Sequence, residues 1–305
     1  MHRLTLGDFE LTVLSDGHYF IDGGAMFGVI PKALWERKIK ADARNRVEMG
    51  LNSLLIRDGK RTILVETGVG PKLPEKVQRV YNNEARLLRS FEEAGVSPEE
   101  VDVVINTHLH FDHCGWNTHY KNGRLVATFP RARYYVQRGE WEHAQNPNDR
   151  DYVSYISENY NPLVESGQME LISGDREIVP GISVRIYPGH TRHMQAVMIR
   201  SGGETACYIS DLIPMSQHLN IAWTMSYDSF PVETMAQKKR FYAEAIPNRW
   251  VVVFTHDHFL PWAYVEPGED DGKYVARPLE RGVAEIVPVP AAASPYPQFP
   301  AEKVA

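Results

Sequence analysis

The segment "HLHFDHCG" at residues 108–115 holds the densest group of chemistry-bearing side chains in the sequence. It follows the apolar run "VDVVIN", which is typical of a buried β-strand. His108 and His110 are two residues apart, so an extended backbone points both imidazoles to the same side. Asp112 and His113 are expected to follow after a bend. The spacing therefore allows each pair to bind its own metal ion, with the two ions side by side.

The residue types in this segment favour a catalytic metal site over a structural one. Imidazole suits zinc and other late divalent ions, whereas carboxylate suits harder ions. A structural zinc site in a reduced protein would more often use cysteines, and Cys114 is alone in the segment and need not be a ligand. Burying these side chains without partners would be costly, so packing does not explain why they occur together.

Three later segments repeat one arrangement, in which an apolar extended run ends at a histidine or an aspartate. They are "SVRIYPGH", "TACYISD" and "WVVVFTHDH", and they bring His190, Asp211 and His256 to strand ends. Binding sites in α/β proteins usually lie where strand ends meet at one edge of a sheet. We therefore expect these residues to lie beside the first segment.

The elements that must position these residues alternate between strands and helices. Residues 3–22 alternate like a β-hairpin, residues 83–95 have helical spacing, and "SPEE" at 97–100 is typical of a capped helix start. Residues 231–246 predict a further helix before the strand "RWVVVFTHDH". This order favours a single α/β domain over residues 1–285.

Two segments do not follow this pattern. Residues 22–50 are irregular and apolar, which fits a loop packed on the core, a cap over a pocket or a contact in a homodimer. Residues 286–305 are rich in proline and alanine and predict an extended tail. The candidate apolar side chains of a substrate pocket are Met26, Phe27, Ile30, Trp35, Trp223 and Phe259.

Composition excludes several classes of protein. A net charge of −6 makes nucleic acid a poor partner, because a phosphate-backbone binder normally carries a basic surplus. No apolar run approaches the roughly 18 residues that a membrane helix needs. The N-terminus lacks the pattern of a signal peptide, and the two cysteines cannot form a disulfide framework. The expectation is a cytoplasmic protein that binds a small molecule with an apolar portion.

Several segments together resemble the metallo-β-lactamase superfamily. "THLHFDHCG" is similar to its H-x-H-x-D-H signature, and "NSLLIRDGKRTILVETG", "PGHTRHMQAV", "YISDL" and "VFTHDH" resemble its other motifs in the same order. "LGDFELTVLSDG", "GAMFGVIPKALW", "FPRARYYVQRGEWE" and "THDHFLPW" resemble the branch of methyl-parathion-hydrolase-like enzymes and quorum-quenching lactonases. The resemblance implies a four-layer αβ/βα sandwich with two mixed β-sheets.

The resemblance also implies a ligand set for two divalent ions, with zinc favoured and manganese, iron or cobalt as alternatives. His108, His110 and His190 would hold one ion, Asp112, His113 and His256 the other, and Asp211 would bridge them. A hydroxide between the ions would be the nucleophile, with Asp112 as the catalytic residue that delivers a proton to the leaving oxygen.

Further residues near these motifs are expected to support the ligands or line the pocket. Glu66 stands where the family has an aspartate, and His193 and His258 would orient a ligand or line the pocket. Pro214 stands where the lactonase branch has a tyrosine. The remaining histidines are expected to pack or face solvent: His2, His18, His119, His143 and His218.

Three functions are consistent with this set of residues. The first is a hydrolase of ester or lactone bonds, with an N-acyl-homoserine lactone as a candidate substrate. The second is an aryl phosphotriesterase or a thioesterase on the same metals, since each reaction develops charge on oxygen. The third is a metal-binding protein without turnover, for which a broken ligand set would be the signature.

Overall fold

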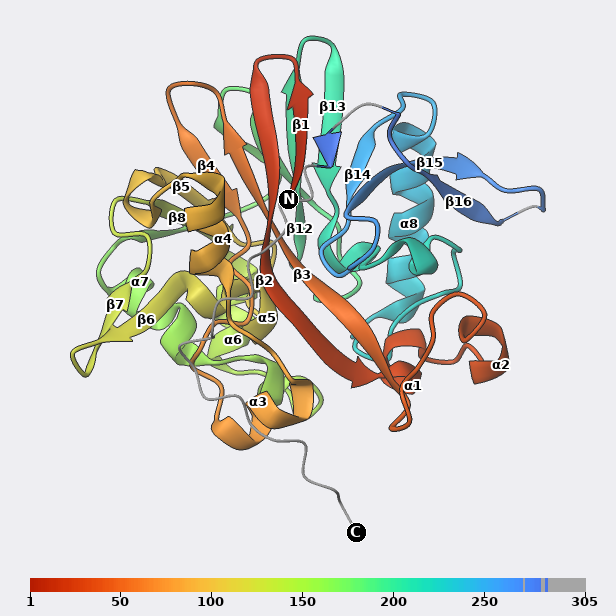
Figure 1. Ribbon diagram of the computed structural model, residues 1–305, viewed down its shortest axis with the longest axis horizontal. Coiled ribbons are helices and arrows are strands. Elements are labelled where there is room, and N and C mark those ends of the chain that lie inside the picture. The colour runs from red at the N-terminus through yellow and green to blue at the C-terminus, as the bar shows by residue number, and fades with distance from the viewer. Residues whose placement is uncertain (271, 281–282, 285–305) are drawn as a thin grey trace.

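Two large β-sheets face each other in the computed structural model, which describes residues 1–270, 272–280 and 283–284 (Figure 1). The first sheet has the order β17-β1-β2-β3-β4-β5-β8-β9 and the second β10-β11-β12-β13-β14-β15-β16, while β6 and β7 form a separate pair. The strands of the first sheet are β1 (His2–Leu6), β2 (Phe9–Asp22), β3 (Arg46–Arg57), β4 (Thr62–Val65), β5 (Val103–Ile105), β8 (Arg133–Gln137), β9 (Met169–Ile172) and β17 (Val283–Ala284). The others are β6 (Thr118–Lys121), β7 (Arg124–Ala127), β10 (Arg176–Val179), β11 (Ile182–Ile186), β12 (Gln195–Ser201), β13 (Glu204–Tyr208), β14 (Val251–Val253), β15 (Trp262–Pro267) and β16 (Tyr274–Arg277).

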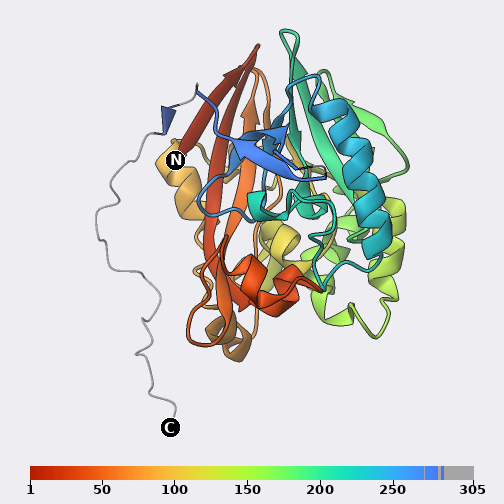
Figure 2. The same cartoon turned by 90° about the vertical axis from the view of Figure 1, so that its right-hand side faces the viewer.

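Helices cover the outer face of each sheet, and the side view shows the resulting layers (Figure 2). α4, α6 and α7 pack on the first sheet, and α8 packs on the second. The predicted four-layer sandwich with two mixed sheets is therefore confirmed. The helices are α1 (Gly23–Phe27), α2 (Lys32–Trp35), α3 (Glu75–Tyr81), α4 (Leu87–Ala94), α5 (Phe111–Cys114), α6 (Arg138–Gln145), α7 (Asn161–Glu165) and α8 (Pro231–Ala245).

The central strands are buried on both faces, which explains their continuous apolar sequences. In β4, Ile63 and Val65 point into the core between the sheets, while Leu64 points into the core beneath the helices. Strands covered on both faces are expected to be apolar at every position rather than at alternate ones. Each such side chain contributes about 1.5–3 kcal/mol through burial.

Most predicted elements are confirmed, with shifts at their ends. The hairpin over 3–22 is present as β1 and β2. The predicted helix over 83–95 begins only at Leu87, because Ala85 has a φ of 50°, outside the right-handed helical region. The capped start at 97–100 is a single 3₁₀ turn, whose capping box is formed by Ser97 and Glu100.

The segment 22–50 contains more regular secondary structure than predicted. Its first part forms α1 and α2, and its last five residues belong to β3, so the prediction of a loop was wrong for residues 46–50. Val47 and Met49 alternate with half-buried residues and pack into the core, and this favours continued pairing with β2. The role of the rest of the segment as a cap or dimer contact stays a prediction. The predicted tail 286–305 lies outside the described residues.

Among the described residues, every helix is too short or too polar to span a bilayer.

Candidate metal centre

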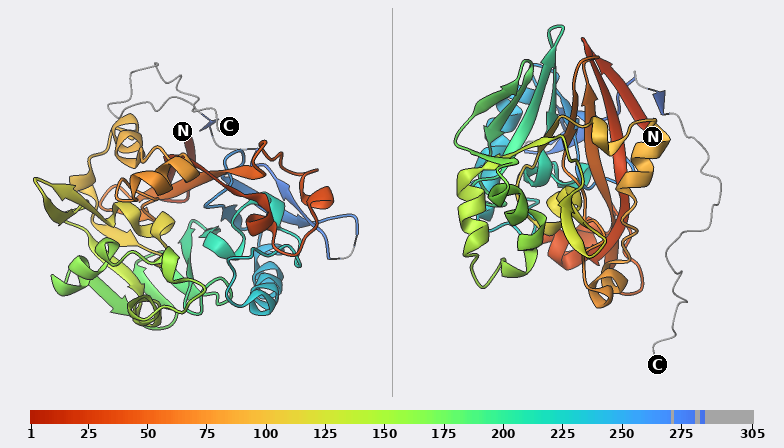
Figure 3. Two further views of the ribbon diagram at one scale, coloured as in Figure 1. Left: turned by 90° about the horizontal axis from the view of Figure 1, so that it is seen from below. Right: turned by 90° about the vertical axis from the view of Figure 1, so that its left-hand side faces the viewer.

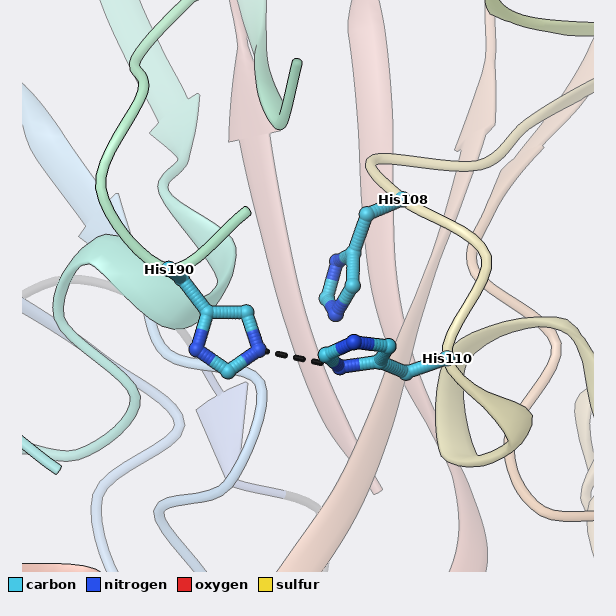
Figure 4. A group of neighbouring side chains, drawn as sticks. All are labelled: His108, His110 and His190. Atoms are coloured by element: carbon cyan, nitrogen blue, oxygen red, sulfur yellow. Dashed lines mark hydrogen bonds between the residues drawn. The ribbon is translucent and has the colours of Figure 1, made fainter. Parts of the chain in front are cut away.

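Three histidines from two loops form the first group of candidate ligands. His108 and His110 follow β5, His190 follows β11, and their rings point toward one another (Figure 4). The His190 Nε2 lies 3.0 Å from the His110 Nδ1, and one nitrogen of each ring lies within 4.8 Å of the others. All three side chains are buried. The spacing fits three imidazoles around one metal ion.

Asp112, His113 and His256 form a second group beside the first. Asp112 and His113 lie on α5, and His256 follows β14. The Asp112 Oδ2 lies 3.7 Å from the Nε2 of His113 and 3.7 Å from the Nε2 of His256. One donor atom of each residue lies within 4.8 Å of the others, so this group can also surround one ion.

Asp211 lies between the two groups, on a short 3₁₀ turn (Ser210–Leu212) after β13. Its Oδ2 lies 3.2 Å from the His190 Nε2 and 3.6 Å from the His113 Nε2, and its Oδ1 lies 3.3 Å from the His256 Nε2. In the view from below, the yellow segment around α5 and the teal segment after β13 lie close together (Figure 3). One carboxylate therefore reaches both groups.

The donor atoms at this centre fit divalent metal ions. Several of them are buried and have no hydrogen-bond partner within the described chain: His108 Nε2, His110 Nε2, both ring nitrogens of His113 and Asp211 Oδ1. A buried polar atom without a partner costs about 1–3 kcal/mol. Metal coordination would give all of these atoms a partner and would remove the free-energy cost of burying them.

The pKa shifts of the side chains at this centre also fit divalent metal ions. Burial lowers the pKa of His108 and His110 well below the ordinary value, and the neighbouring imidazoles lower it further. Burial also acts against a charged His113, but Asp112, Asp211 and Glu66 outweigh it and raise the pKa of that ring. Burial raises the pKa of Asp211, yet the surrounding histidines outweigh this effect and hold its pKa well below normal. The carboxylates beside His113 therefore favour positive charge at this place, as a bound cation would supply it.

The ring nitrogens that point away from the centre have partners in three cases. Each partner lies at 3.0 Å: the Thr107 Oγ1 for His108, the Asp228 Oδ1 for His190 and the Gly50 carbonyl for His256. Contacts of this kind select the tautomer and turn the opposite nitrogen toward the metal. Asp228 and Gly50 were missed in the sequence, because a single acid or glycine in a loop carries no local signal.

Replacing Asp228 by alanine is expected to weaken zinc binding about 10–100-fold, because His190 loses the carboxylate that orients its ring. Competition with a chromophoric chelator measures this affinity. The exposed Asp149 provides a matched control, and its alanine variant should bind zinc like the wild type. Equal affinities for both variants would contradict a positioning role for Asp228.

Tyr19 and Glu140 also support the centre, and neither was predicted. The Tyr19 hydroxyl donates to the Asp112 Oδ2 at 2.7 Å. Glu140 is buried on α6 and accepts from the Leu109 backbone at 3.2 Å and from the Thr191 hydroxyl at 2.6 Å. Glu140 thereby ties the loop of His108 and His110 to the loop of His190. The residues in these contacts are 31 to 93 positions apart along the chain, so no short sequence motif predicts them.

The three residues predicted to support the ligands lie in different surroundings. Glu66 is buried, accepts from the Thr107 backbone at 3.0 Å and lies 3.5 Å from the His113 Nδ1. The His193 ring packs against Gly139 of α6. His258 lies on the other side of β3, with its Nε2 3.6 Å from the Glu48 Oε1. A supporting role stays a prediction for all three, and for His258 the geometry points away from the metal centre.

The six residues predicted to line a substrate pocket differ in how deeply they are buried. Met26, Phe27 and Trp35 are at most 1% exposed and form a packed cluster in which Phe27 stacks on Trp35. Ile30 and Trp223 are partly buried against this cluster, whereas Phe259 is 67% exposed. Contact with a substrate stays a prediction for all six.

Cys114 is a packing residue in this structure. Its thiol is buried and donates to the backbone carbonyls of Leu109 and His110 at 3.4 and 3.3 Å. Burial raises the pKa of Cys114 and of Cys207 well above the ordinary value, so neither forms a thiolate near neutral pH. We expect neither cysteine to react with a colorimetric disulfide reagent until denaturant is added. Rapid reaction of the native protein would contradict this expectation.

Comparison with known proteins gives a consistent family. Residues 47–256 match the family described as "Metallo-beta-lactamase superfamily". A protein from Bacillus sp. named N-acyl homoserine lactonase is 32% identical over 137 residues, which are 45% of each chain. The N-acyl homoserine lactonase AiiB of Agrobacterium fabrum is 23% identical over 235 residues, 69% of this chain and 80% of AiiB. The match thus spans under half the length of the first relative.

Solved structures share the whole architecture. A probable metal-dependent hydrolase from Staphylococcus aureus has a TM-score of 0.81 and 29% identity, covering 90% of this chain and 99% of its own. AidC, described as a dizinc quorum-quenching lactonase, has a TM-score of 0.78 and 19% identity over 92% of this chain and 97% of its own. At that identity, the second likeness concerns the fold alone.

Proposed function

The chain belongs to the metallo-beta-lactamase superfamily. We therefore propose that it hydrolyses an ester or lactone bond with two divalent metal ions, and that these ions are zinc. The observation that carries the proposal is the position of Asp211. Its two oxygens lie 3.2–3.6 Å from histidines of both ligand groups, so one carboxylate can join two ions. The curated relatives named N-acyl homoserine lactonase favour a lactone with an acyl chain as the substrate.

The chain's own residues divide the work of such a hydrolysis. When bound, two divalent ions lower the pKa of water and polarise the carbonyl. Asp211 sets the separation of the two groups, while Asp228 and the Gly50 carbonyl keep His190 and His256 aimed at the centre. The oxygen of water bonds to the carbonyl carbon, the carbon–oxygen bond of the ring breaks, and a proton passes to the leaving oxygen.

Asp112 is the residue we propose to hold that proton. Its side chain is 12% exposed and that of Asp211 is 6% exposed, so Asp112 is the more accessible of the two carboxylates. The Tyr19 hydroxyl fixes its Oδ2 at 2.7 Å, so the carboxylate keeps one orientation during turnover. A fixed orientation favours this role, because a side chain transfers a proton only from hydrogen-bonding distance of the accepting atom.

A hydrolysis panel on the zinc-loaded protein tests the proposal. An N-acyl-homoserine lactone, an aryl ester, an aryl phosphotriester and a thioester are compared by kcat/KM. The lactone is expected to have the highest value. A phosphotriester or thioester with a higher value would transfer the assignment to that class, and metal-loaded protein without turnover on any of the four would refute the proposed activity.

A further inference from the structure

A second cluster of metal-ligand side chains lies outside the centre described above. The His18 Nδ1 lies 2.6 Å from the Glu48 Oε1, and the His258 Nε2 lies 3.6 Å from the same oxygen. The centroids of the two imidazole rings are 4.3 Å apart, and one donor atom of each residue lies within 4.8 Å of the others. We propose that His18, Glu48 and His258 bind a further zinc or similar late divalent ion. The proposal goes beyond the hydrolase activity and does not depend on it.

The pairing of β2 and β3 explains why His18 and Glu48 share a face. His18 lies opposite Gly50, and Phe20 lies opposite Glu48. Side chains alternate along a strand, so His18 and Glu48 point to one side of this ribbon. Tyr19, between His18 and Phe20, points to the other side, where it contacts Asp112. The cluster therefore lies behind the metal centre, with the two strands between them.

Gly50 is the reason that His258 reaches this face. A Cβ atom at Gly50 would lie 3.1 Å from the His258 Cα and 3.2 Å from its backbone nitrogen, which is tighter than ordinary contact. The absence of a side chain lets the segment after β14 cross β3 at this point. The Gly50 backbone also donates to the His256 carbonyl at 2.9 Å and accepts from its ring. The same glycine thus serves both the centre and the cluster.

The donor set and its exposure suit an ion with open coordination positions. Two imidazoles and one carboxylate are a common zinc set, completed by water. With bonds of about 2.0–2.1 Å, ligand atoms around a tetrahedral zinc lie roughly 3.3 Å apart. The observed 2.6 and 3.6 Å lie on either side of that value. The side chains are 29–33% exposed, so water and ions can reach them.

A bound ion at this cluster would join three separate parts of the chain. It would fasten the segment that carries His256 and His258 to both β2 and β3. Gly50 of β3 and His256, which are in contact, are 206 residues apart along the chain. An ion that binds only the folded state stabilises it by mass action. Zinc is therefore expected to raise the thermal unfolding temperature through this cluster, separately from its effect at the metal centre.

The test uses the Asp211→Ala protein, in which the metal centre is impaired, so that its outcome is independent of hydrolysis. Zinc per chain is measured after equilibrium dialysis in this background. Adding His18→Ala, Glu48→Gln or His258→Ala is expected to remove one equivalent of zinc and the accompanying rise in unfolding temperature. His143→Ala is the matched control, because His143 is also 33% exposed and lies 2.8 Å from a carboxylate, that of Asp151, but belongs to no group of three among the described residues.

Two outcomes would overturn the proposal. One is that the Asp211→Ala protein binds no zinc. The other is that His18→Ala, Glu48→Gln and His258→Ala leave the zinc content of that background unchanged, as the His143→Ala control should. In either case the three side chains form only a hydrogen-bonded group. Circular dichroism of each variant distinguishes loss of the ion from loss of the fold.

Discussion

Replacing Asp211 by alanine is expected to lower kcat/KM for lactone hydrolysis at least about 10³-fold, equivalent to about 4 kcal/mol of transition-state stabilisation. The physical reason is its place between the two ligand groups. Its oxygens lie 3.2 Å from the His190 Nε2 and 3.3 Å from the His256 Nε2. Without this carboxylate, the two ligand groups would lose the negative charge that lies between them, and two bound cations would repel one another more strongly. Steady-state kinetics on zinc-loaded protein and metal analysis measure the two effects together.

Two further variants make this result specific. Asp211→Asn keeps the shape of the side chain and loses its charge, so it should also lose most of the activity. Asp149→Ala removes an exposed carboxylate on the surface and should leave kcat/KM within about twofold of the wild type, since surface changes away from the site are usually small. A tenfold or smaller effect of Asp211→Ala, with unchanged metal content, would show that Asp211 does not bridge two ions.

Replacing Gly115 by alanine is expected to destabilise the fold by about 3 kcal/mol or more and to weaken metal binding. An added Cβ would lie 1.8 Å from the Val69 carbonyl oxygen and 2.1 Å from its carbonyl carbon, and neither backbone atom can move alone. The Gly115 N–H also donates to the Gly68 carbonyl at 2.7 Å. Gly115 follows α5 directly, so relief of the clash would displace Asp112 and His113. Urea unfolding and zinc affinity measure the two consequences.

Gly59 provides an informative control for this prediction. Gly59 has a φ of 77°, where alanine is strained, but a Cβ there would meet nothing within 4 Å. Its alanine variant should lose only about 1–2 kcal/mol. Gly115 has a φ of −62°, which alanine adopts freely. A larger loss for Gly59→Ala than for Gly115→Ala would mean that backbone strain, rather than close approach, governs these positions.

The fold and the candidate ligands could be predicted from the sequence because their signals are local. Alternating apolar residues predict strands such as β1 and β2. The two-residue spacing of His108 and His110 predicts that both imidazoles lie on one side, and their rings do face one another although the backbone bends at residues 107–108. Strand ends that carry His190, Asp211 and His256 could be found in the same way. The structure brings these residues together, and their binding of metal stays a prediction that the experiments above address.

The remaining features depend on contacts between distant residues. Asp228 meets His190 across 38 residues, Tyr19 meets Asp112 across 93, and the Gly50 carbonyl meets His256 across 206. His18 was predicted to pack or to face solvent, and the pairing of β2 with β3 places it beside Glu48.

The sequence by itself therefore determined the types of the candidate ligands and the strand ends that carry them, since both are local properties of the chain. Only the tertiary structure decided which partners the ring nitrogens of the histidines have, which face of β2 turns toward the metal centre and where His258 points. These depend on sheet register and on the close approach that Gly50 permits, and both arise only when distant strands pack.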